Sequence, residues 1–465
     1  MTAVRTPRPY QVAAIQAVRE AMRHHRRVLL QLPTGAGKTF VAATVAKGAH
    51  AKGRRVVFLV HRAELVDQTS RTFAEEGIPH GVIAAGPAGG RWMGNEPVIV
   101  ASVQTLARRL DAVPAPDLLF VDEAHHAAAG TWQRILNAWP EAWAVGLTAT
   151  PERLDGRGLV GAFEAMVTGP SVAELIRDGY LATFRAFAPS TADLSGCRIR
   201  MGEFAAGDVE AAMDRPSITG DIVSHYQRLA ESKRAVLFAA SVAHSQHLAE
   251  AFQSAGIPAA HVDGETPRDQ RRQTVADFAA GRVRVLCNVE LFGEGFDVPG
   301  VEAVILARPT QSLGLYLQQV GRALRPAPGK DHALILDHVG NIARHGLPDD
   351  PREWSLDAKS RRQRKTDETG PMVRQCPECF AMHRPAPRCP ECGHSHEAKP
   401  HQMAHADGDL VEVDPAALHR EKRREQGEAR SLDDLVRLAR ARGFRNPHGW
   451  AHHVLKAREA KGAAA

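Results

Sequence analysis

The sequence lacks an apolar run long enough to cross a lipid bilayer, and its first residues contain no signal-peptide core. These absences argue against a membrane-spanning or exported protein, and we expect a cytoplasmic one. Cysteine is scarce as well. The chain has six, of which four lie within 17 residues and two, Cys197 and Cys287, are isolated. This spacing argues against a disulfide framework and favours a metal site.

Most of the chain has no excess of positive or negative charge. Residues 1–350 carry 37 Lys and Arg against 36 Asp and Glu, whereas residues 351–465 carry 22 against 17. The near-neutral first part must therefore hold any anionic polymer by local groups. The basic last part suits nucleic acid, and a merely solvated surface explains it equally well. With 465 residues, the chain should form two or three domains.

A glycine-rich stretch at 32–39 follows an apolar run and precedes helix-like sequence. This order is typical of a phosphate-binding loop, here with one residue fewer than usual before Gly-Lys-Thr. Gly35 and Gly37 allow backbone N–H groups to turn around a polyphosphate, and the helix directs its positive N-terminus at the same anion. Lys38 adds a positive charge, and Thr39 offers a hydroxyl to Mg²⁺. The predicted contacts are Thr34, Gly35, Ala36, Gly37, Lys38 and Thr39.

Further apolar runs end in polar residues and alternate with helix-like sequence, at 56–60, 98–101, 118–121 and 144–147. The pattern predicts a parallel sheet whose function lies at the carboxyl ends of its strands. After the third run, Asp122 can hold Mg²⁺ and Glu123 can orient or deprotonate a water. A helix N-cap is the alternative, but it does not explain why this pair follows a phosphate loop on the same sheet.

Gln11 lies at the start of a helical pattern upstream of the loop. Its amide offers both a donor and an acceptor, so it can contact an adenine edge. A surface glutamine is the alternative, and only the position before the phosphate loop favours adenine.

A second α/β pattern begins near residue 216 and lacks a phosphate loop. It contains the stretches 293–297 and 318–325 instead. On a helix, Gln318, Arg322 and Arg325 project together, and arginines on one rim suit bidentate contact with phosphate. Two such halves imply a site in the cleft between them.

Two Cys-x-x-Cys knuckles, formed by Cys376, Cys379, Cys389 and Cys392, are separated by nine residues. Four thiolates can enclose Zn²⁺ and leave no open position, so the pattern predicts a structural zinc site. A redox or iron–sulfur role is the alternative. We also hypothesise that the knuckles present Arg384 and Arg388 to nucleic acid.

The expected organisation is a first lobe at 1–185, a connector at 186–215, a second lobe at 216–345, a charged linker at 346–375, a zinc ribbon at 376–396, a linker at 397–430 and a helical hairpin at 431–460. A capped helix begins after Ser431, and a second follows Pro447. We expect this small hairpin to dock on the rest of the chain or on a partner protein.

With these motifs assembled, residues 5–340 resemble the superfamily 2 helicases and translocases. The motifs occur in the family's order, at 35–39, 61–68, 102–106, 122–125, 148–150, 293–297 and 318–325. His125 makes the acidic motif a DEAH-type box. The stretches 8–11, 122–126, 295–297 and 321–330 are most similar to bacterial RadD-like DNA-repair helicases and their phage relatives. The resemblance implies an α/β fold with two tandem RecA-like parallel-sheet lobes.

The resemblance also implies residue roles. Hydrolysis of ATP is assigned to Lys38, Thr39, Asp122 and Glu123, with Arg322 and Arg325 as arginine fingers. Gly295 and Asp297 join the nucleotide site. Coupling to lobe movement is assigned to His125, Thr148, Thr150 and Gln318. Contacts with the phosphates of a single strand are assigned to Arg62, Gln68 and Gln104. Asn288 replaces the usual threonine of the sixth motif and offers a hydrogen bond to phosphate.

These observations predict an ATP-dependent DNA helicase or translocase that uses ATP, Mg²⁺ and Zn²⁺, in DNA repair or phage DNA metabolism. No aromatic wedge for parting a duplex is evident, so a translocase that unwinds poorly stays open. The alternatives are an RNA-directed helicase, the motor subunit of a restriction or defence system, and a nucleic-acid-binding module without turnover. Intact Lys38, Glu123 and Arg322 argue against the last.

Overall fold

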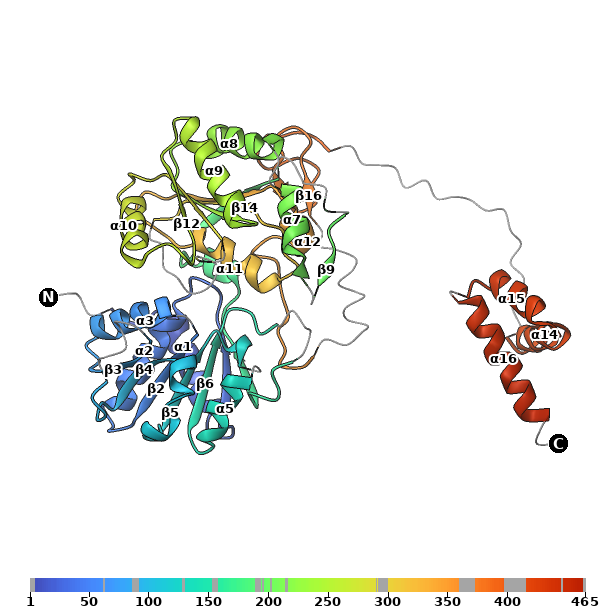
Figure 1. Cartoon of the computed structure of the whole chain (residues 1–465), viewed down its shortest axis with the longest axis horizontal. Coiled ribbons are helices and arrows are strands. Elements are labelled where there is room, and N and C mark those ends of the chain that lie inside the picture. The colour runs from blue at the N-terminus through green and yellow to red at the C-terminus, as the bar shows by residue number, and fades with distance from the viewer. Residues whose placement is uncertain are drawn as a thin grey trace. The chain divides into compact units, whose positions relative to one another are not determined.

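The computed structural model describes residues 5–61, 63–85, 92–127, 130–152, 158–188, 194, 196–200, 203–213, 216–289, 291, 300–358, 373–396, 415–444 and 446–462. The chain divides into two compact units, Met1–Glu397 and Ala398–Ala465. The first unit contains two α/β lobes, which Figure 1 colours blue to teal and green to orange.

The first lobe is built on a seven-stranded parallel sheet in the order β3-β4-β2-β5-β6-β1-β7. Its strands are β1 (Arg27–Gln31), β2 (Val56–Val60), β3 (Gly81–Ile83), β4 (Val98–Ser102), β5 (Leu118–Asp122), β6 (Trp143–Thr148) and β7 (Ala165–Thr168). Successive apolar residues of β2 alternate between two cores: Phe58 packs in one and Leu59 in the other. This burial on both faces explains why the parallel strands have continuous apolar sequences.

Helices cover the first sheet. They are α1 (Pro9–Ala21), α2 (Lys38–His50), α3 (Ala63–Glu75), α4 (Val103–Leu106) and α5 (Gly130–Ala138). Two short 3₁₀ turns, η2 (Leu110–Ala112) and η3 (Ala124–His126), follow α4 and β5, respectively. Helix α6 (Val172–Arg177) begins with a capping box, in which Ser171 accepts from the Glu174 amide and Glu174 accepts from Ser171. It leads the chain out of the first lobe.

The second lobe is a six-stranded parallel sheet in the order β12-β13-β11-β14-β15-β8. Its strands are β8 (Thr183–Phe187), β11 (Ala235–Ala239), β12 (Ala259–Val262), β13 (Val285–Asn288), β14 (Ala303–Ala307) and β15 (His332–Asp337). Its helices are α7 (Ala206–Met213), α8 (Pro216–Ala230), α9 (Val242–Ser254), α10 (Arg268–Ala279), α11 (Leu313–Ala323) and α12 (Asn341–His345).

The boundary between the lobes differs from the expected one at 185. Strand β8 spans residues 183–187 and pairs with β15, so it belongs to the second sheet. The expected connector also contains a short hairpin, β9 (Ile199–Arg200) and β10 (Glu203–Phe204), and helix α7. Local sequence does not show which sheet β8 joins, because its position is fixed only by pairing with β15, about 150 residues later in the chain.

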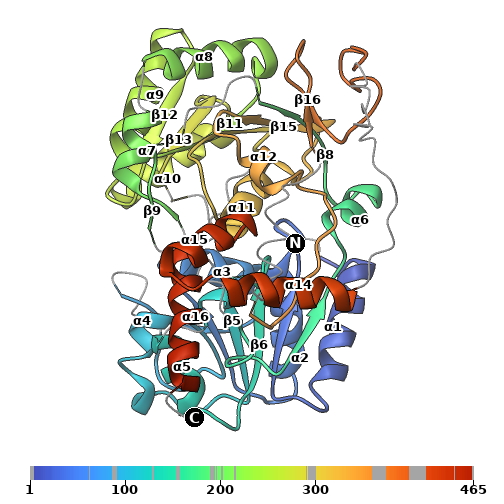
Figure 2. The same ribbon diagram turned by 90° about the vertical axis from the view of Figure 1, so that its right-hand side faces the viewer.

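The cysteine-rich segment forms a ribbon with β16 (Arg374–Gln375) and β17 (Met382–His383). The ribbon packs on the free edge of β8, as Figure 2 shows. The Ala188 amide donates to the Phe380 carbonyl at 3.0 Å, and Arg185 donates to Glu391 at 2.6 Å. The ribbon is therefore an extension of the second lobe and covers an otherwise exposed sheet edge.

Residues 347–358 form a strap that runs from the second lobe to the first. The Arg352 guanidinium donates to four backbone carbonyls, which belong to His345, Leu347, Pro348 and Asp350. The far end is anchored on the first lobe, where the Leu159 amide donates to the Leu356 carbonyl at 2.7 Å. This part of the expected linker at 346–375 is thus ordered by contacts. Residues 359–372 lie outside the described residues.

The second unit contains three helices: α14 (Pro415–Glu428), α15 (Leu432–Ala441) and α16 (Pro447–Gly462). Helix α14 corrects the expectation of a linker at 397–430. Its polar sequence has no apolar stripe, so its helical state depends on neighbours: Arg442 donates to Glu425 at 2.7 Å, and Arg458 donates to the Ala429 carbonyl at 2.8 Å. The small core comprises Leu435, Val436, Ala451 and Val454.

Two parallel-sheet lobes, a cysteine ribbon and C-terminal helices confirm the predicted α/β fold class. Among the residues that the structure describes, no helix has both the length and the apolar character needed to cross a membrane.

Candidate active site between the lobes

The phosphate-binding loop connects β1 to α2. Gly35 and Gly37 have φ angles of 87° and 82°, in the left-handed region that glycine adopts without strain. Gly37 is the N-cap of α2, so the first N–H groups of that helix have no intrahelical acceptor and face the loop. Lys38 and Thr39 are the first two residues of α2 and are half-buried. This geometry suits the binding of an anion.

The start of α1 braces the same loop. The Ala36 carbonyl accepts from the Tyr10 hydroxyl at 2.8 Å and from Gln11 Nε2 at 3.0 Å. Gln11 Oε1 accepts from the Arg8 amide at 2.9 Å. The Gln11 side chain is therefore engaged by the protein at both ends. Sequence reasoning missed this bracing role, because only the fold shows that α1 touches the loop.

A cavity of about 480 Å³ lies beside these residues. Gln11 and the loop glycines line it, together with Arg8 and Phe40. The Arg8 guanidinium lies 5.1 Å from the ring centre of Tyr180, and the Tyr10 and Tyr180 rings are 5.0 Å apart. An apolar and cationic wall next to a phosphate loop suits a nucleotide base. Arg8 and Phe40 were not predicted as contacts, although both are close to the loop motifs in sequence.

The two acidic residues occupy the carboxyl end of β5. Asp122 is the last residue of the strand, and Glu123 follows with a φ of 47°. This left-handed conformation is uncommon for a residue with a side chain and costs about 1–3 kcal/mol. Both side chains are buried, with relative exposures of 7% and 4%. Because the backbone turns sharply at Glu123, the two carboxylates leave the strand in different directions.

A polar relay extends from Glu123 into the first lobe. Glu123 Oε2 lies 3.6 Å from His125 Nδ1, and that nitrogen lies 3.3 Å from the Thr148 hydroxyl. The Thr148 hydroxyl donates to the Thr150 carbonyl at 2.9 Å. The structure thus brings together the residues that the sequence assigned to hydrolysis and to coupling.

Helix α11 of the second lobe closes the relay from the other side. Gln318 Nε2 donates to Glu123 Oε2 at 3.4 Å. A methyl group added to Gly314 would come within 2.7 Å of the Thr150 hydroxyl, and one added to Gly321 within 2.6 Å of Thr34. These three positions of α11, four and three residues apart, share one face of the helix. Glycine at both ends allows the helix to lie directly on the phosphate loop and on the Thr148–Thr150 turn.

The two arginines differ in position. Arg322 is buried within α11, with a relative exposure of 3%. Arg325 lies beyond the helix, which ends at Ala323, so the expected single helical face carries only Gln318 and Arg322. The aliphatic part of Arg325 packs near Gly35 of the loop. Desolvation by burial lowers the pKa of Arg325 to about 10, and the side chain stays a cation at neutral pH.

A lysine missed by sequence reasoning holds the segment that carries Arg325. Lys330 Nζ donates to the carbonyls of Val301, Ala323 and Arg325. Desolvation by burial is the main cause that lowers the pKa of Lys330 to about 8. A cation at the end of α11 also interacts favourably with the helix dipole.

The predicted nucleic-acid residues are only partly grouped. Gln104 is exposed at the start of α4, and Gln68 is half-buried on α3. Asn288 is fully buried, and its amide donates to the Leu237 carbonyl at 2.7 Å. A phosphate contact by Asn288 is therefore not supported, because the side chain ties β13 to β11 instead. Arg62, Gly295 and Asp297 lie outside the described residues.

An ion pair missed by sequence reasoning joins the lobes. Asp67 on α3 contacts Arg268, the first residue of α10. Both helices begin after the carboxyl end of a strand in their own lobe. The pair therefore bridges the two lobes on the side formed by the carboxyl ends of the strands, where the contacts with a single strand are predicted. Sequence offers no cue for it, since the partners are 201 positions apart.

The residues between the lobes fit ATP and Mg²⁺. Thr34 Oγ1 and Gln318 Oε1 are buried and have no hydrogen-bond partner among the described residues. Such atoms beside a glycine-lined loop are suited to a polar ligand. Thr39 and Asp122 would hold Mg²⁺ through their side-chain oxygens, and the bound ion would neutralise developing phosphate charge. Glu123 is the remaining carboxylate that can act on a water.

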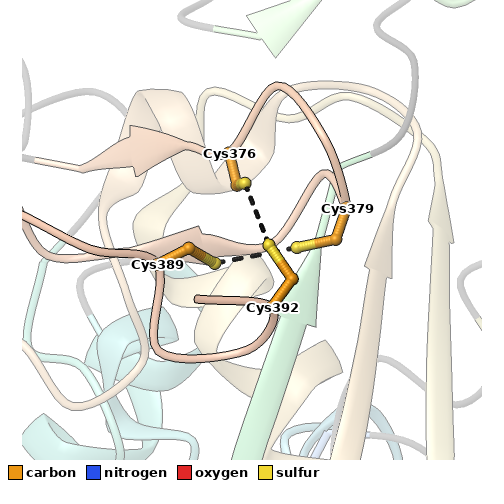
Figure 3. A group of neighbouring side chains, drawn as sticks. All are labelled: Cys376, Cys379, Cys389 and Cys392. Atoms are coloured by element: carbon orange, nitrogen blue, oxygen red, sulfur yellow. Dashed lines mark hydrogen bonds between the residues drawn. The ribbon is translucent and has the colours of Figure 1, made fainter. Parts of the chain in front are cut away.

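The four cysteines of the ribbon point their sulfur atoms toward one another (Figure 3). These sulfur atoms all lie within 4.8 Å of one another. The Sγ atoms of Cys376 and Cys392 are 3.6 Å apart, and those of Cys379 and Cys389 are 3.7 Å apart. Zn–S bonds of about 2.3 Å in a tetrahedron place sulfurs about 3.8 Å apart, so the geometry fits zinc. Arg384 donates to Asp349 and Asp350 of the strap at 2.8 Å, so a contact of its guanidinium with nucleic acid would compete with these pairs.

Comparison with known proteins agrees with this site. Residues 5–153 match the family model "Type III restriction enzyme, res subunit", and residues 219–327 match "Helicase conserved C-terminal domain". A 51.5 kDa protein of Lactococcus phage (isolate 7-9) is 37% identical over 354 residues, which are 76% of this chain and 75% of that protein.

Two further similarities are more distant. Saccharomyces cerevisiae IRC3, provisionally named an ATP-dependent helicase, is 31% identical over 356 residues, covering 72% of this chain and 51% of that protein. The chain thus spans about half the length of the yeast relative. The ATP-dependent Type ISP restriction-modification enzyme LlaBIII, solved bound to DNA, has a TM-score of 0.54 at 17% identity over 71% of this chain and 27% of that one, which shows a common fold. The family models and the phage and yeast relatives agree with the two-lobed site, and the chain belongs to helicase superfamily 2, whose families hydrolyse ATP.

Proposed function

We propose that the protein is a DNA-dependent ATPase that translocates on or unwinds DNA, in DNA repair or phage DNA metabolism. The observation that carries the proposal is the contact between Gln318 of the second lobe and Glu123 of the first. A change at the nucleotide is thereby transmitted directly to α11, and through it to the whole second lobe. A DNA 3'-5' translocase, XPB2 of Sulfurisphaera tokodaii, is 24% identical over 377 residues, and this relative favours DNA as the polymer.

The roles of the residues follow from their positions. Loop residues 34–39 bind the phosphates, and Gln11 stands beside the base cavity. Glu123 orients the attacking water and accepts its proton, while Arg322 and Arg325 offset phosphate charge. A change at Glu123 reaches α11 through the polar contacts of His125, Thr148 and Thr150. Arg62, Gln68 and Gln104 contact phosphates of one strand, which suits stepping that is independent of base identity.

Steady-state ATP hydrolysis tests the proposal. The protein is assayed without polymer and with single-stranded, duplex and forked DNA and RNA. We expect strong stimulation by single-stranded or forked DNA. We expect Glu123→Gln to lower the rate by 10²-fold or more while ATP still binds, because the amide cannot accept a proton. Stimulation by RNA alone moves the substrate to RNA. No hydrolysis with any polymer contradicts the proposal.

We also propose that the ribbon binds zinc and that the metal supports the second lobe. Cys376 and Cys389 are buried in the same core as β8 and β15. Removing Zn²⁺ takes away the ion that holds the four cysteines together and releases the edge of β8. Hydrogen exchange of residues 183–187 should therefore accelerate at least tenfold after chelation or in Cys376→Ser.

Cys197→Ser is the matched control, because Cys197 lies outside the cluster. It should leave exchange at β8 unchanged. Metal analysis of the purified protein should give one zinc per chain. Iron, or unchanged exchange at β8 after complete metal removal, would contradict a structural zinc site.

A further inference from the structure

The three helices of the second unit are rich in positive charge. Residues 415–462 contain twelve Lys and Arg against six Asp and Glu, a net charge of +6, which equals that of the full chain. The rest of the chain is balanced. A three-helix unit of this size with such a surplus has a strongly positive potential, which attracts polyanions.

Some of these cations are used to hold the unit together. Arg442 has a side-chain exposure of 17% and is paired with Glu425, and Arg458 donates to carbonyls near the end of α14. Arg437 and Arg424 make local pairs with Asp434 and Glu428. Such exposed pairs contribute little to stability and screen the surface only in part.

The remaining cations are exposed on all three helices. Arg423 on α14, Arg440 on α15 and Lys456 on α16 make no ion pair or side-chain hydrogen bond with any described residue. His448 and His452 share the face of α16 with Lys456, because they are spaced four residues apart. All three residues are exposed. Fold stability does not require this surface, so its charge is available to a ligand.

An aromatic pair lies at the turn between α15 and α16. The Phe444 and Trp450 rings stack with centres 5.0 Å apart and an angle of 19° between their planes. Phe444 is 43% exposed, which is unusual for a large apolar side chain. An exposed aromatic ring on a unit whose helices also carry exposed Lys and Arg offers a base a stacking surface and phosphates a positive charge.

We propose that this basic surface, Arg423, Arg440 and Lys456 with the Phe444–Trp450 stack, is a second binding site for single-stranded nucleic acid. The inference rests on the proposed function, since it adds a contact with the same polymer outside the two lobes. The site binds phosphates without reading sequence and offers one stacking position. It raises the local concentration of the strand near the motor.

The test uses the full-length protein and a labelled single-stranded oligonucleotide at several salt concentrations. The variant is Arg423→Glu with Arg440→Glu and Lys456→Glu. The matched control is Arg19→Glu with Arg23→Glu and Lys52→Glu, which makes the same charge change at exposed positions near the amino ends of the first-lobe strands. We expect the variant to bind at least tenfold more weakly at low salt. The slope of log K against log salt should fall by about 2, as about 0.7 is lost for each phosphate contact.

The stacking role has its own variants. Phe444→Ala should weaken binding of single strands about five- to tenfold and leave duplex binding unchanged, whereas Phe444→Tyr should retain the affinity. ATP hydrolysis separates this inference from the proposed function. The triple variant should keep its maximal DNA-stimulated rate but require at least tenfold more DNA to reach half of it.

If no polymer stimulates ATP hydrolysis by the wild-type protein, the proposed function is refuted. The oligonucleotide-binding assay still tests the basic surface, because it does not depend on hydrolysis. The inference is overturned if the triple variant and its control give the same affinity and the same salt slope. In that case the surface would be assigned to a protein partner.

Discussion

Glu123 shows how one residue carries both strain and function. Its left-handed backbone is maintained because the His126 amide donates to the Glu123 carbonyl at 3.0 Å and because β5 fixes Asp122 on the preceding side. Its carboxylate then meets His125 and Gln318 from opposite lobes. A residue of ordinary backbone geometry would direct the carboxylate elsewhere, so the strain positions the group that acts on water.

Kinetics of a Gln11 variant can distinguish bracing of the phosphate loop from contact with the adenine base. We expect Gln11→Ala to raise the KM for ATP about tenfold and to change kcat little, because the amide braces the Ala36 carbonyl and the Arg8 amide rather than the reacting atoms. The loss of one buried and one partly buried hydrogen bond also lowers the free energy of unfolding by about 1–3 kcal/mol.

Comparison of ATP with GTP checks the adenine contact predicted for Gln11. If Gln11 reads the base, the preference for ATP disappears in Gln11→Ala. If it only braces the loop, KM rises equally for both nucleotides. A kcat that falls as far as kcat/KM would contradict both roles.

At the scale of one element, α11 determines how closely the lobes approach. Its face against the first lobe consists of Gly314, Gln318 and Gly321. The two glycines allow close contact because they have no side chain, and the Gln318 amide between them contacts Glu123. The sequence motif predicted Gln318 and the arginines. It gave no reason for the glycines, since a missing Cβ matters only when a neighbour from the other lobe lies within about 3 Å.

Gly321→Ala tests this close approach. The added methyl group would lie only 2.6 Å from Thr34, so Thr34 must move or the lobes must separate. We expect polymer-stimulated hydrolysis to fall at least tenfold, equivalent to about 1.4 kcal/mol of transition-state stabilisation. ATP binding and thermal stability should change little, because each lobe keeps its own core.

Gly48→Ala on α2 is the matched control for this prediction. A methyl group there meets nothing within 4 Å, so hydrolysis should be unchanged and the helix slightly more stable. Equal effects of the two substitutions would show that the lobes do not approach through Gly321.

At the scale of the whole first unit, the described residues connect the lobes through contacts besides those of the nucleotide site. These contacts involve the strap held by Arg352, the ribbon bound to that strap through Arg384, and the Asp67–Arg268 pair. Acid should weaken this assembly through buried histidines. Desolvation by burial lowers the pKa of His338 to about 3 and that of His345 to about 4.

Both histidines are neutral when folded, and an unfolded histidine has a pKa near 6.5. Between these values the unfolded state binds more protons than the folded state. Stability is therefore fully present above about pH 6.5 and is lost as the pH falls toward 4. Each histidine contributes a slope of up to about 1.4 kcal/mol per pH unit.

Urea denaturation between pH 7.5 and 5 measures this dependence. His338→Phe should reduce the dependence of unfolding free energy on pH, because a phenyl ring cannot bind a proton. The same substitution at the exposed His24 should leave that dependence unchanged. A slope that is the same in wild type and His338→Phe would refute the role of His338.

The amino-acid sequence by itself determined the parallel-sheet lobes, the phosphate loop, Asp122 with Glu123, and the four cysteines. Each depends on local signals: apolar runs, glycine spacing and residue types at fixed separations. The tertiary structure alone decided the rest. The placement of β8 in the second sheet, the burial of Asn288, the strap and the Asp67–Arg268 pair depend on contacts between residues far apart in sequence. Such contacts leave no periodicity in the chain, because their energy comes from surfaces that meet only after folding.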